Sequence, residues 1–218
     1  LSIRRQRQMF IRDSHTIGAG GGSMIWTDDG GMLRVGPQSA GADPGPACYG
    51  RGGRVPTLTD AHVIRNTVRP EAFLGGRMAI FSERSRAVFQ PIADQLEMSL
   101  EDAADSAVQL TNANVGRAIQ LVSTERGFDP RDYVLVPFGG AGPLHAASVA
   151  SDLGIAQVVV PPSAGVISAY GLIASDFTQF TSLTRRVRVD DSAPDIIRQT
   201  YAGMAEDCLL YTSDAADE

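Results

Sequence analysis

The hydrophobic pattern is clearest in the middle of the chain. A mostly apolar run at residues 133–138 (YVLVPF) leads into a glycine turn at residues 139–142 (GGAG). An Ala-rich segment then continues to residue 153, and Gly154 follows it. Proline at the first helical position and glycine just past the last one are typical of a helix, here residues 143–153. The pattern therefore predicts a buried strand, a tight turn and a helix.

A second apolar run at residues 157–160 predicts another strand, and Ser163 is placed to cap a helix over residues 164–174. The turn between the first strand and its helix is open to two interpretations. Glycines allow a ligand to approach the backbone, and a helix N-terminus offers unpaired N–H groups to it. The alternative is a plain β–α connection in which glycine only makes the turn.

Two familiar nucleotide-binding loops do not match this turn. The dinucleotide fingerprint needs a small residue where His145 stands and an acidic residue at the end of the second strand, which instead ends in two prolines. A P-loop needs a lysine, and the chain contains none.

The remaining pattern predicts a β-hairpin and several helices. Two short apolar runs, at residues 24–27 and 32–35, flank a turn of Asp and Gly and predict a hairpin. A loop is predicted after it at residues 36–53, and helices are predicted at residues 57–64, 82–97 and 99–127. We expect Ser82 to cap the second helix and Pro91 to kink it or break it in two. Ser99 and Asp102 form a shortened capping box for the third. An exposed strand is expected at 3–12, a strand at 177–189, and a last helix from Asp191.

Composition narrows the function classes. The net charge of −6 makes nucleic acid an unsuitable partner, and the absence of lysine excludes lysine nucleophiles. The most apolar window, residues 155–174, is interrupted by prolines and glycines, so no membrane span is predicted. With two cysteines and no signal peptide, a reducing cytoplasmic location is expected.

The last eleven residues, 208–218 (CLLYTSDAADE), read like the translated mosaic-end adapter of a transposase sequencing library. We interpret them as non-native and expect them to interrupt the last helix at Asp207. Cys48 is then the one natural cysteine, and a buried small hydrophobe is its default role.

Several long motifs resemble the hydantoinase/oxoprolinase A family, which includes N-methylhydantoinase A, 5-oxoprolinase and the matching subunit of acetone-type carboxylases. They occur in the family's order at residues 15–23 (HTIGAGGGS), 31–50 (GMLRVGPQSAGADPGPACYG), 57–61 (LTDA after Thr57), 123–132 (STERGFDPRD), 138–145 (FGGAGPLH) and 165–172 (GVISAYGL). Ser14 and residues 27–29 depart from the family pattern.

The resemblance implies an α/β fold, namely the C-terminal lobe of an actin-like ATPase (ribonuclease H-like) fold with an inserted β-hairpin and a glycine-rich loop. Residues 1–176 would be part of that domain, 177–207 the start of a downstream region and 208–218 the adapter tail. The family's acidic phosphate motifs, which bind ATP and Mg²⁺, are expected upstream, so this piece alone should not hydrolyse ATP.

The reaction that the resemblance implies is phosphorylation of a cyclic amide oxygen, of the hydantoin or 5-oxoproline type, for ring opening with a B-type subunit or domain. The alternatives are the ATP-using subunit of a ketone carboxylase and a non-catalytic nucleotide-binding module.

The candidate site residues fall into two groups. Nucleotide contacts are expected from the turn: Gly139, Gly140, Ala141 and Gly142. A substrate and phosphate loop is expected from Gly18, Gly20, Gly21, Gly22, Ser23 and Asp60. The glycine N–H groups would donate to a developing oxyanion, and Asp60 would aid a metal or phosphate. His15 is the candidate proton donor.

Each candidate also has a structural interpretation. The glycine run can simply let the hairpin pass close to a neighbouring strand, and Asp60 can cap its own helix. His145 either contacts ligand or packs, His62 is expected at the surface, and Asn112 and Asn114 should face solvent or another helix. No metal site is predicted in this chain.

Overall fold

The computed structural model describes residues 15–175 and 181–214, with side chains as far as residue 206. These residues fall into two compact units that divide between Tyr170 and Gly171. The predicted strand at 3–12 lies outside the described residues.

The predicted hairpin is confirmed. Strand β1 (Ser23–Thr27) pairs antiparallel with β2 (Leu33–Ser39), with Ile25 opposite Val35. Strand β2 continues four residues past the predicted end at Val35, so the predicted loop begins only after Ser39. The extension exists because Ser39 pairs with Ser23 across an irregular register.

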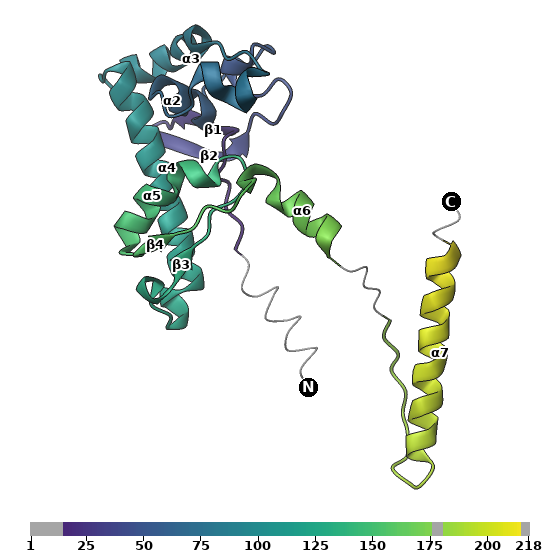
Figure 1. Cartoon of the computed structure of the whole chain (residues 1–218). Coiled ribbons are helices and arrows are strands. Elements are labelled where there is room, and N and C mark those ends of the chain that lie inside the picture. The colour runs from purple at the N-terminus through teal and green to yellow at the C-terminus, as the bar shows by residue number, and fades with distance from the viewer. Residues whose placement is uncertain (1–14, 176–180, 215–218) are drawn as a thin grey trace. The chain divides into compact units, whose positions relative to one another are not determined.

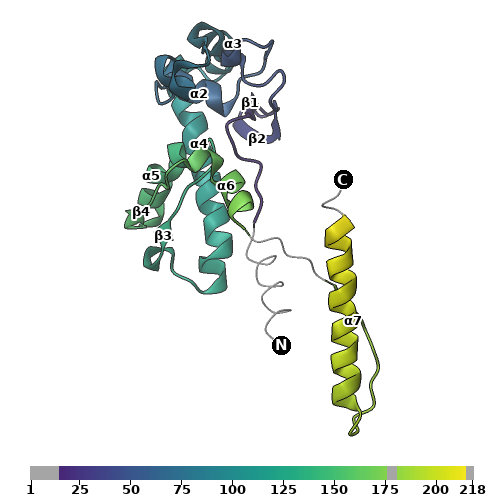
Figure 2. The same ribbon diagram turned by 45° about the vertical axis from the view of Figure 1, so that its right-hand side comes forward.

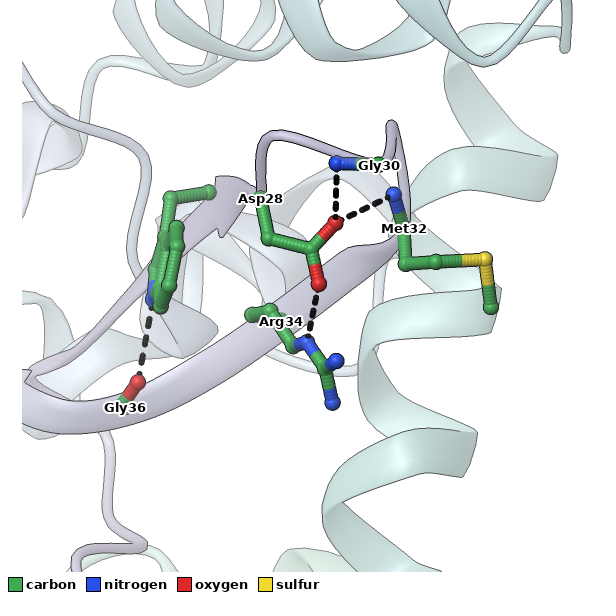
Figure 3. A network of polar contacts seen from close by, with 6 residues as sticks. Asp28, Gly30, Met32, Arg34 and Gly36 are labelled. Atoms are coloured by element: carbon green, nitrogen blue, oxygen red, sulfur yellow. Dashed lines mark hydrogen bonds and ion pairs between the residues drawn. The ribbon is translucent and has the colours of Figure 1, made fainter.

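The turn of the hairpin is organised by one carboxylate (Figure 3). Oδ1 of Asp28 accepts the N–H groups of Gly30 and Met32, both at 3.0 Å, and Oδ2 accepts Nε of Arg34 at 2.8 Å. These bonds lower the pKa of Asp28. Trp26 Nε1 donates to the carbonyl of Gly36 at 3.0 Å, which ties the two strands together on the other side. The departure from the family pattern at residues 27–29 is thus a self-sufficient turn.

Three helices pack against this hairpin. They are α2 (Leu58–Ile64), α3 (Ser82–Gln95) and α4 (Leu100–Val122), preceded by 3-10 turns at Ala47–Tyr49 and Pro70–Gly76. Figures 1 and 2 show α2, α3 and the hairpin around one end of the long α4. The core between them is formed by Ile25, Leu58, Ala61, Phe89, Ala93, Ala103, Ala104, Ala107 and Val108. Small alanines along α4 let the other helices approach it closely.

Two details of these helices differ from the prediction. Pro91 lies inside one continuous α3, so the expected break does not occur. Pro91 and Ala87, whose carbonyl loses its partner, are both exposed, and water can satisfy that carbonyl. The N-cap of α3 is Phe81, with no side-chain cap, and Ser82 is already helical. Ser99 does cap α4 through the N–H of Asp102, at 3.1 Å, as predicted.

The predicted β–α–β unit is confirmed, with shorter strands. The prediction that the first strand is buried is wrong: Val134 is 46% exposed, and both residues of the second strand are exposed. Strand β3 (Val134–Leu135) pairs parallel with β4 (Gln157–Val158), and α5 (Gly142–Leu153) connects them. Helix α5 ends at Gly154 in the left-handed conformation, as the pattern predicts, and it packs along α4 (Figures 1 and 2). The strands are short because, in the described part of the chain, they pair only with each other.

The predicted helix at 164–174 is a 3-10 turn (Ala164–Val166) followed by α6 (Ile167–Ala174), and Ser163 makes no side-chain cap. In the second unit, residues 181–189 form no strand, which corrects the described part of the prediction for 177–189. Each of the two described sheets has two strands, and neither sheet includes this segment. Helix α7 (Ala193–Asp214) begins where expected but runs past Asp207, so the expected interruption there is wrong.

Within the residues that the structure describes, none of the helices combines the length and the apolar character needed to cross a membrane.

Candidate functional site

The glycine run before β1 contains glycines of two kinds. At three of these glycines, an added Cβ would lie too close to a neighbour. It would lie 2.8 Å from the Pro37 backbone at Gly18 and 2.8 Å from Thr59 Oγ1 at Gly21. At Gly22 it would lie 2.7 Å from Ser39 Oγ. These three positions are glycine because neighbours approach them closely. By contrast, a Cβ on Gly20 would meet no atom within 4 Å. Close packing therefore explains Gly18, Gly21 and Gly22, whereas Gly20 borders open space.

Ser23 holds this loop in shape. Its Oγ accepts the N–H of Gly20 at 2.9 Å and donates to the carbonyl of Gly18 at 3.3 Å. The hydroxyl is thus committed to the loop backbone, and Ser23 is itself buried.

The glycine turn before α5 leaves backbone donors open. Gly139 has φ +84° and donates its N–H to the carbonyl of Ala164 at 2.8 Å. The N–H groups of Gly140, Ala141 and Gly142 donate to no acceptor among the described residues, and no side chain caps the helix. A Cβ on Gly140 would meet nothing within 4 Å. The turn therefore has both the donors and the space that a polar ligand needs.

A cavity of about 220 Å³ brings the two glycine segments together. It lies between α4 and the β3–α5 connection, and Ala19 and Gly20 close one side of it. Its lining includes Thr111, Val115, Phe138, Ala141, Gly142 and His145, and is mostly apolar. Of the two predicted groups, Gly20 and Ala141–Gly142 meet here, whereas Gly139 and Gly140 do not line the cavity.

His145 stands in the first turns of α5, at the cavity wall. Its Nδ1 lies 2.7 Å from Oδ1 of Asn112 on α4, and its Nε2 lies 3.4 Å from Nε2 of His62 on α2. The two imidazole rings meet edge to face, with centroids 4.9 Å apart. The sequence interpretation of His62 as a surface residue is wrong, because its side chain is 1% exposed. Asn112 does face another helix, one of the two orientations expected for it.

The hydrogen bonds between Asn112, His145 and His62 define the tautomers of the two histidines. With Asn112 Oδ1 as acceptor, His145 carries its proton on Nδ1 and accepts at Nε2, so His62 must donate from Nε2. Nδ1 of His62 is then an unprotonated nitrogen, and it is buried without a hydrogen-bond partner among the described residues. Burial, with the charges of His145 and Arg65, lowers the pKa of His62 to about 4. Burial and Arg65 likewise lower the pKa of His145. Both rings are therefore neutral at pH 7.

Asp60 is the hub of a buried polar cluster. It is 0% exposed, and its carboxylate accepts the N–H groups of Ala47, Cys48 and Thr57 and the hydroxyls of Thr57 and Ser85 at 2.7–3.2 Å. With Thr57 it forms a complete capping box for α2. Of its two interpretations, the geometry supports the structural one, since five donors already occupy the carboxylate.

Cys48 lies beside that cluster. Burial, together with the neighbouring Asp60, raises the pKa of its thiol to about 12. The thiol is therefore protonated and fully buried, which agrees with the expected role of a small hydrophobe.

His15 lies apart from the cavity. It is exposed and lines a second groove with Gly18 and with residues of α4. The cavity and this groove have Ala19 in common.

These residues fit part of a nucleotide, but they do not fit Mg²⁺. The open N–H groups and the space at Gly140 suit part of a nucleotide. Of the described residues that line the cavity, none carries a carboxylate, and the described part of the chain holds no cluster of three or more metal-binding side chains. These residues therefore offer Mg²⁺ no ligand set.

Comparison with known proteins shows to which family the chain is similar. The family model for Hydantoinase/oxoprolinase matches residues 6–180. The solved structure of ATP-dependent caprolactamase from Pseudomonas jessenii is 43% identical, with a TM-score of 0.67 over 74% of this chain and 24% of that one. Nucleotide-free acetone carboxylase, from work on ATP-dependent acetone carboxylation, is 33% identical, with a TM-score of 0.68 over 73% and 23%. The gamma subunit of acetophenone carboxylase from Aromatoleum aromaticum is 38% identical over 174 residues, which are 79% of this chain and 24% of the relative.

The chain thus spans about a quarter of the length of each of these three proteins. Its α/β fold has structural neighbours among ATP-dependent hydrolases and carboxylases. The chain belongs to the hydantoinase/oxoprolinase family.

Proposed function

We propose that this chain is part of a longer ATP-dependent subunit that phosphorylates the carbonyl oxygen of a cyclic amide, so that a B-type partner can complete ring opening. In this proposal the chain supplies one lobe of an actin-like ATPase fold, and it works in the cytoplasm. Similarity to an ATP-dependent caprolactamase supports the cyclic amide, because a lactam is one.

The observation that carries the proposal is the meeting of Gly20 with Ala141 and Gly142 around one cavity. We assign the turn at 139–142 to the nucleotide, which would be bound by the open N–H groups of Gly140, Ala141 and Gly142. The apolar walls from α4 and β3 suit the flat face of a base. His145, kept neutral by burial and by the nearby charge of Arg65, presents no charge there.

ATP supplies the phosphoryl group when it is bound. The residues of this chain then orient the reacting oxygen: the backbone of Gly20 borders the cavity, and His15 stands on the other side of Ala19. We propose that His15 donates a proton or hydrogen bond to the substrate carbonyl, which lowers the cost of charge on that oxygen. Phosphate-binding carboxylates and Mg²⁺ are assigned to other parts of the longer subunit, since the described cavity lining has none.

A ketone carboxylase is the second candidate function. Its support is the similarity to acetone carboxylase and to acetophenone carboxylase. The same ATP chemistry would then activate a ketone oxygen as an enol phosphate. A nucleotide-binding module without catalysis is the third candidate.

The experiment that separates the three uses the full-length subunit, expressed with its B-type partner. ADP release is measured with caprolactam, 5-oxoproline and hydantoin, and separately with acetone and acetophenone plus bicarbonate. We expect ADP release and a ring-opened product with a cyclic amide. A carboxylated product would establish the second function instead. ATP binding with no substrate-stimulated ADP release would contradict both enzymatic proposals.

A further inference from the structure

A second groove, of about 300 Å³, lies between residues 15–19 and α4. Its walls are partly apolar, with Ile17, Val35 and Leu121 among them. Three polar side chains also line it: His15, Asn114 and Arg117. From the sequence, Asn114 is expected only to face solvent or another helix, and Arg117 is not a candidate site residue.

These polar groups form a set of donors. Asn114 and Arg117 are three residues apart on α4 and therefore lie on one face of that helix. His15 belongs to the segment that passes over this face. An arginine offers a planar fork of N–H donors, an asparagine offers its amide N–H₂, and a histidine offers a ring N–H.

The positive charge in the groove has no counter-charge among the residues that the structure describes. Arg117 makes no ion pair and no side-chain hydrogen bond with any residue that the structure describes, although Arg34, Arg65, Arg86 and Arg131 each pair with a carboxylate. Among the described residues lining the groove there is no Asp or Glu. A guanidinium with an open fork between apolar walls attracts an anion more strongly than one surrounded by water, because the walls lower the local dielectric.

We propose that this groove binds an oxyanion, held by Arg117 in a two-pronged contact and completed by Asn114 and His15. The shared chemistry is that of a carboxylate or a phosphate group. Because Ala19 borders both the groove and the glycine cavity, the bound anion lies next to the cavity. The inference goes beyond the proposed function: the two share His15, but the anion contact at Arg117 is argued from the groove and not from the ATP reaction.

The test uses the 218-residue chain itself. Inorganic phosphate, butyrate and the neutral butyramide are titrated at matched ionic strength, and the Arg117 side-chain N–H and the backbone amides of Gly18 and Ala19 are followed by NMR. We expect saturable shifts with phosphate or butyrate but not with butyramide. The stronger of the two anions identifies the source as a phosphoryl group or an organic acid.

Arg117→Gln should weaken anion binding on the order of ten- to a hundredfold, the usual range for one charged hydrogen-bonding contact. Arg117→Lys keeps the charge without the fork and should lose less. Arg54→Gln is the matched control, because Arg54 is also exposed and lines neither the groove nor the cavity. The amide spectrum of α4 reports in the same experiment whether each variant is folded.

Three results would overturn the inference. The first is no saturable shift with either anion. The second is equal shifts with butyramide, which would show only an apolar groove. The third is anion binding by folded Arg117→Gln that matches Arg54→Gln. Since none of these measurements involves ATP, their failure leaves the proposed nucleotide site untouched.

Discussion

Acidification should destabilise this fold through one buried ring, His62. The unfolded chain holds His62 with a pKa near the ordinary value of 6.5, and the folded chain holds it at about 4. A folded pKa below the unfolded one means that the folded state favours the neutral ring. Between pH 6.5 and pH 4 the unfolded state therefore binds more protons, and stability falls as the pH falls. The stabilisation is fully present above pH 6.5 and is lost towards pH 4.

The geometry explains why protonation is costly. A proton added to His62 would go to Nδ1, which is buried and has no acceptor among the described residues. It would also place a positive charge beside His145 and Arg65. From the two pKa values we expect a loss of about 1 kcal/mol at pH 5.5 and about 2–3 kcal/mol at pH 4.5.

The assay compares the wild-type chain with His62→Gln in urea, followed by circular dichroism from pH 7.5 to pH 4.5. Glutamine can still donate an N–H to His145 but cannot titrate, so its stability should depend less on pH by the amounts above. Carboxylates titrate in both proteins and cancel in the difference. Parallel pH profiles for the two proteins would show that His62 contributes nothing to acid sensitivity, contrary to this prediction.

Three further predictions concern other residues. Asp60→Asn should lower the free energy of unfolding by at least about 3 kcal/mol, because the new amide N–H₂ would face buried donors whose hydrogen bonds the carboxylate now accepts. A urea midpoint close to that of the wild type would contradict the structural role. In the full-length subunit with its partner, His15→Ala should lower substrate-dependent turnover by ~10²–10⁴-fold and spare ATP affinity, and His15→Asn should recover part of it if only hydrogen bonding matters; full activity of stable His15→Ala would remove the catalytic role. Deleting residues 208–218 should leave the thermal midpoint of the chain unchanged within error, and a clear drop would show that they pack natively.

The elements that can be predicted from the sequence are those determined by residues close together in the chain. The glycine turn, α5 and its left-handed Gly154 follow from residues adjacent in the chain. The same holds for the hairpin and for the capping of α2 by Thr57 and Asp60. In each case the chemistry that determines the element lies within a few positions.

The parts that sequence misses depend on distant partners. His62 is polar and follows a helix start, so pattern places it at the surface, yet α5 buries it against His145, 83 positions away. The glycines of the run look alike in the sequence, and only their neighbours distinguish Gly20 from Gly22. Strand β3 is shorter than its apolar run because strand length depends on pairing, and β4 offers two residues. The residues next to each of these positions in the sequence do not indicate such contacts with distant parts of the chain.

One calorimetric titration shows whether the turn at 139–142 binds ATP. A non-hydrolysable ATP analogue is titrated into the full-length subunit as wild type, Gly140→Val and Gly203→Val. Both glycines lack positive φ and have no atom within 4 Å of an added Cβ, so neither substitution meets a clash at that position, but Gly203 lies on α7 and is not part of the turn at 139–142. We expect weaker binding by Gly140→Val, whose branched side chain fills the space beside the open N–H groups, and wild-type affinity for Gly203→Val. Unchanged affinity in a folded Gly140→Val subunit would show that this turn does not bind the nucleotide.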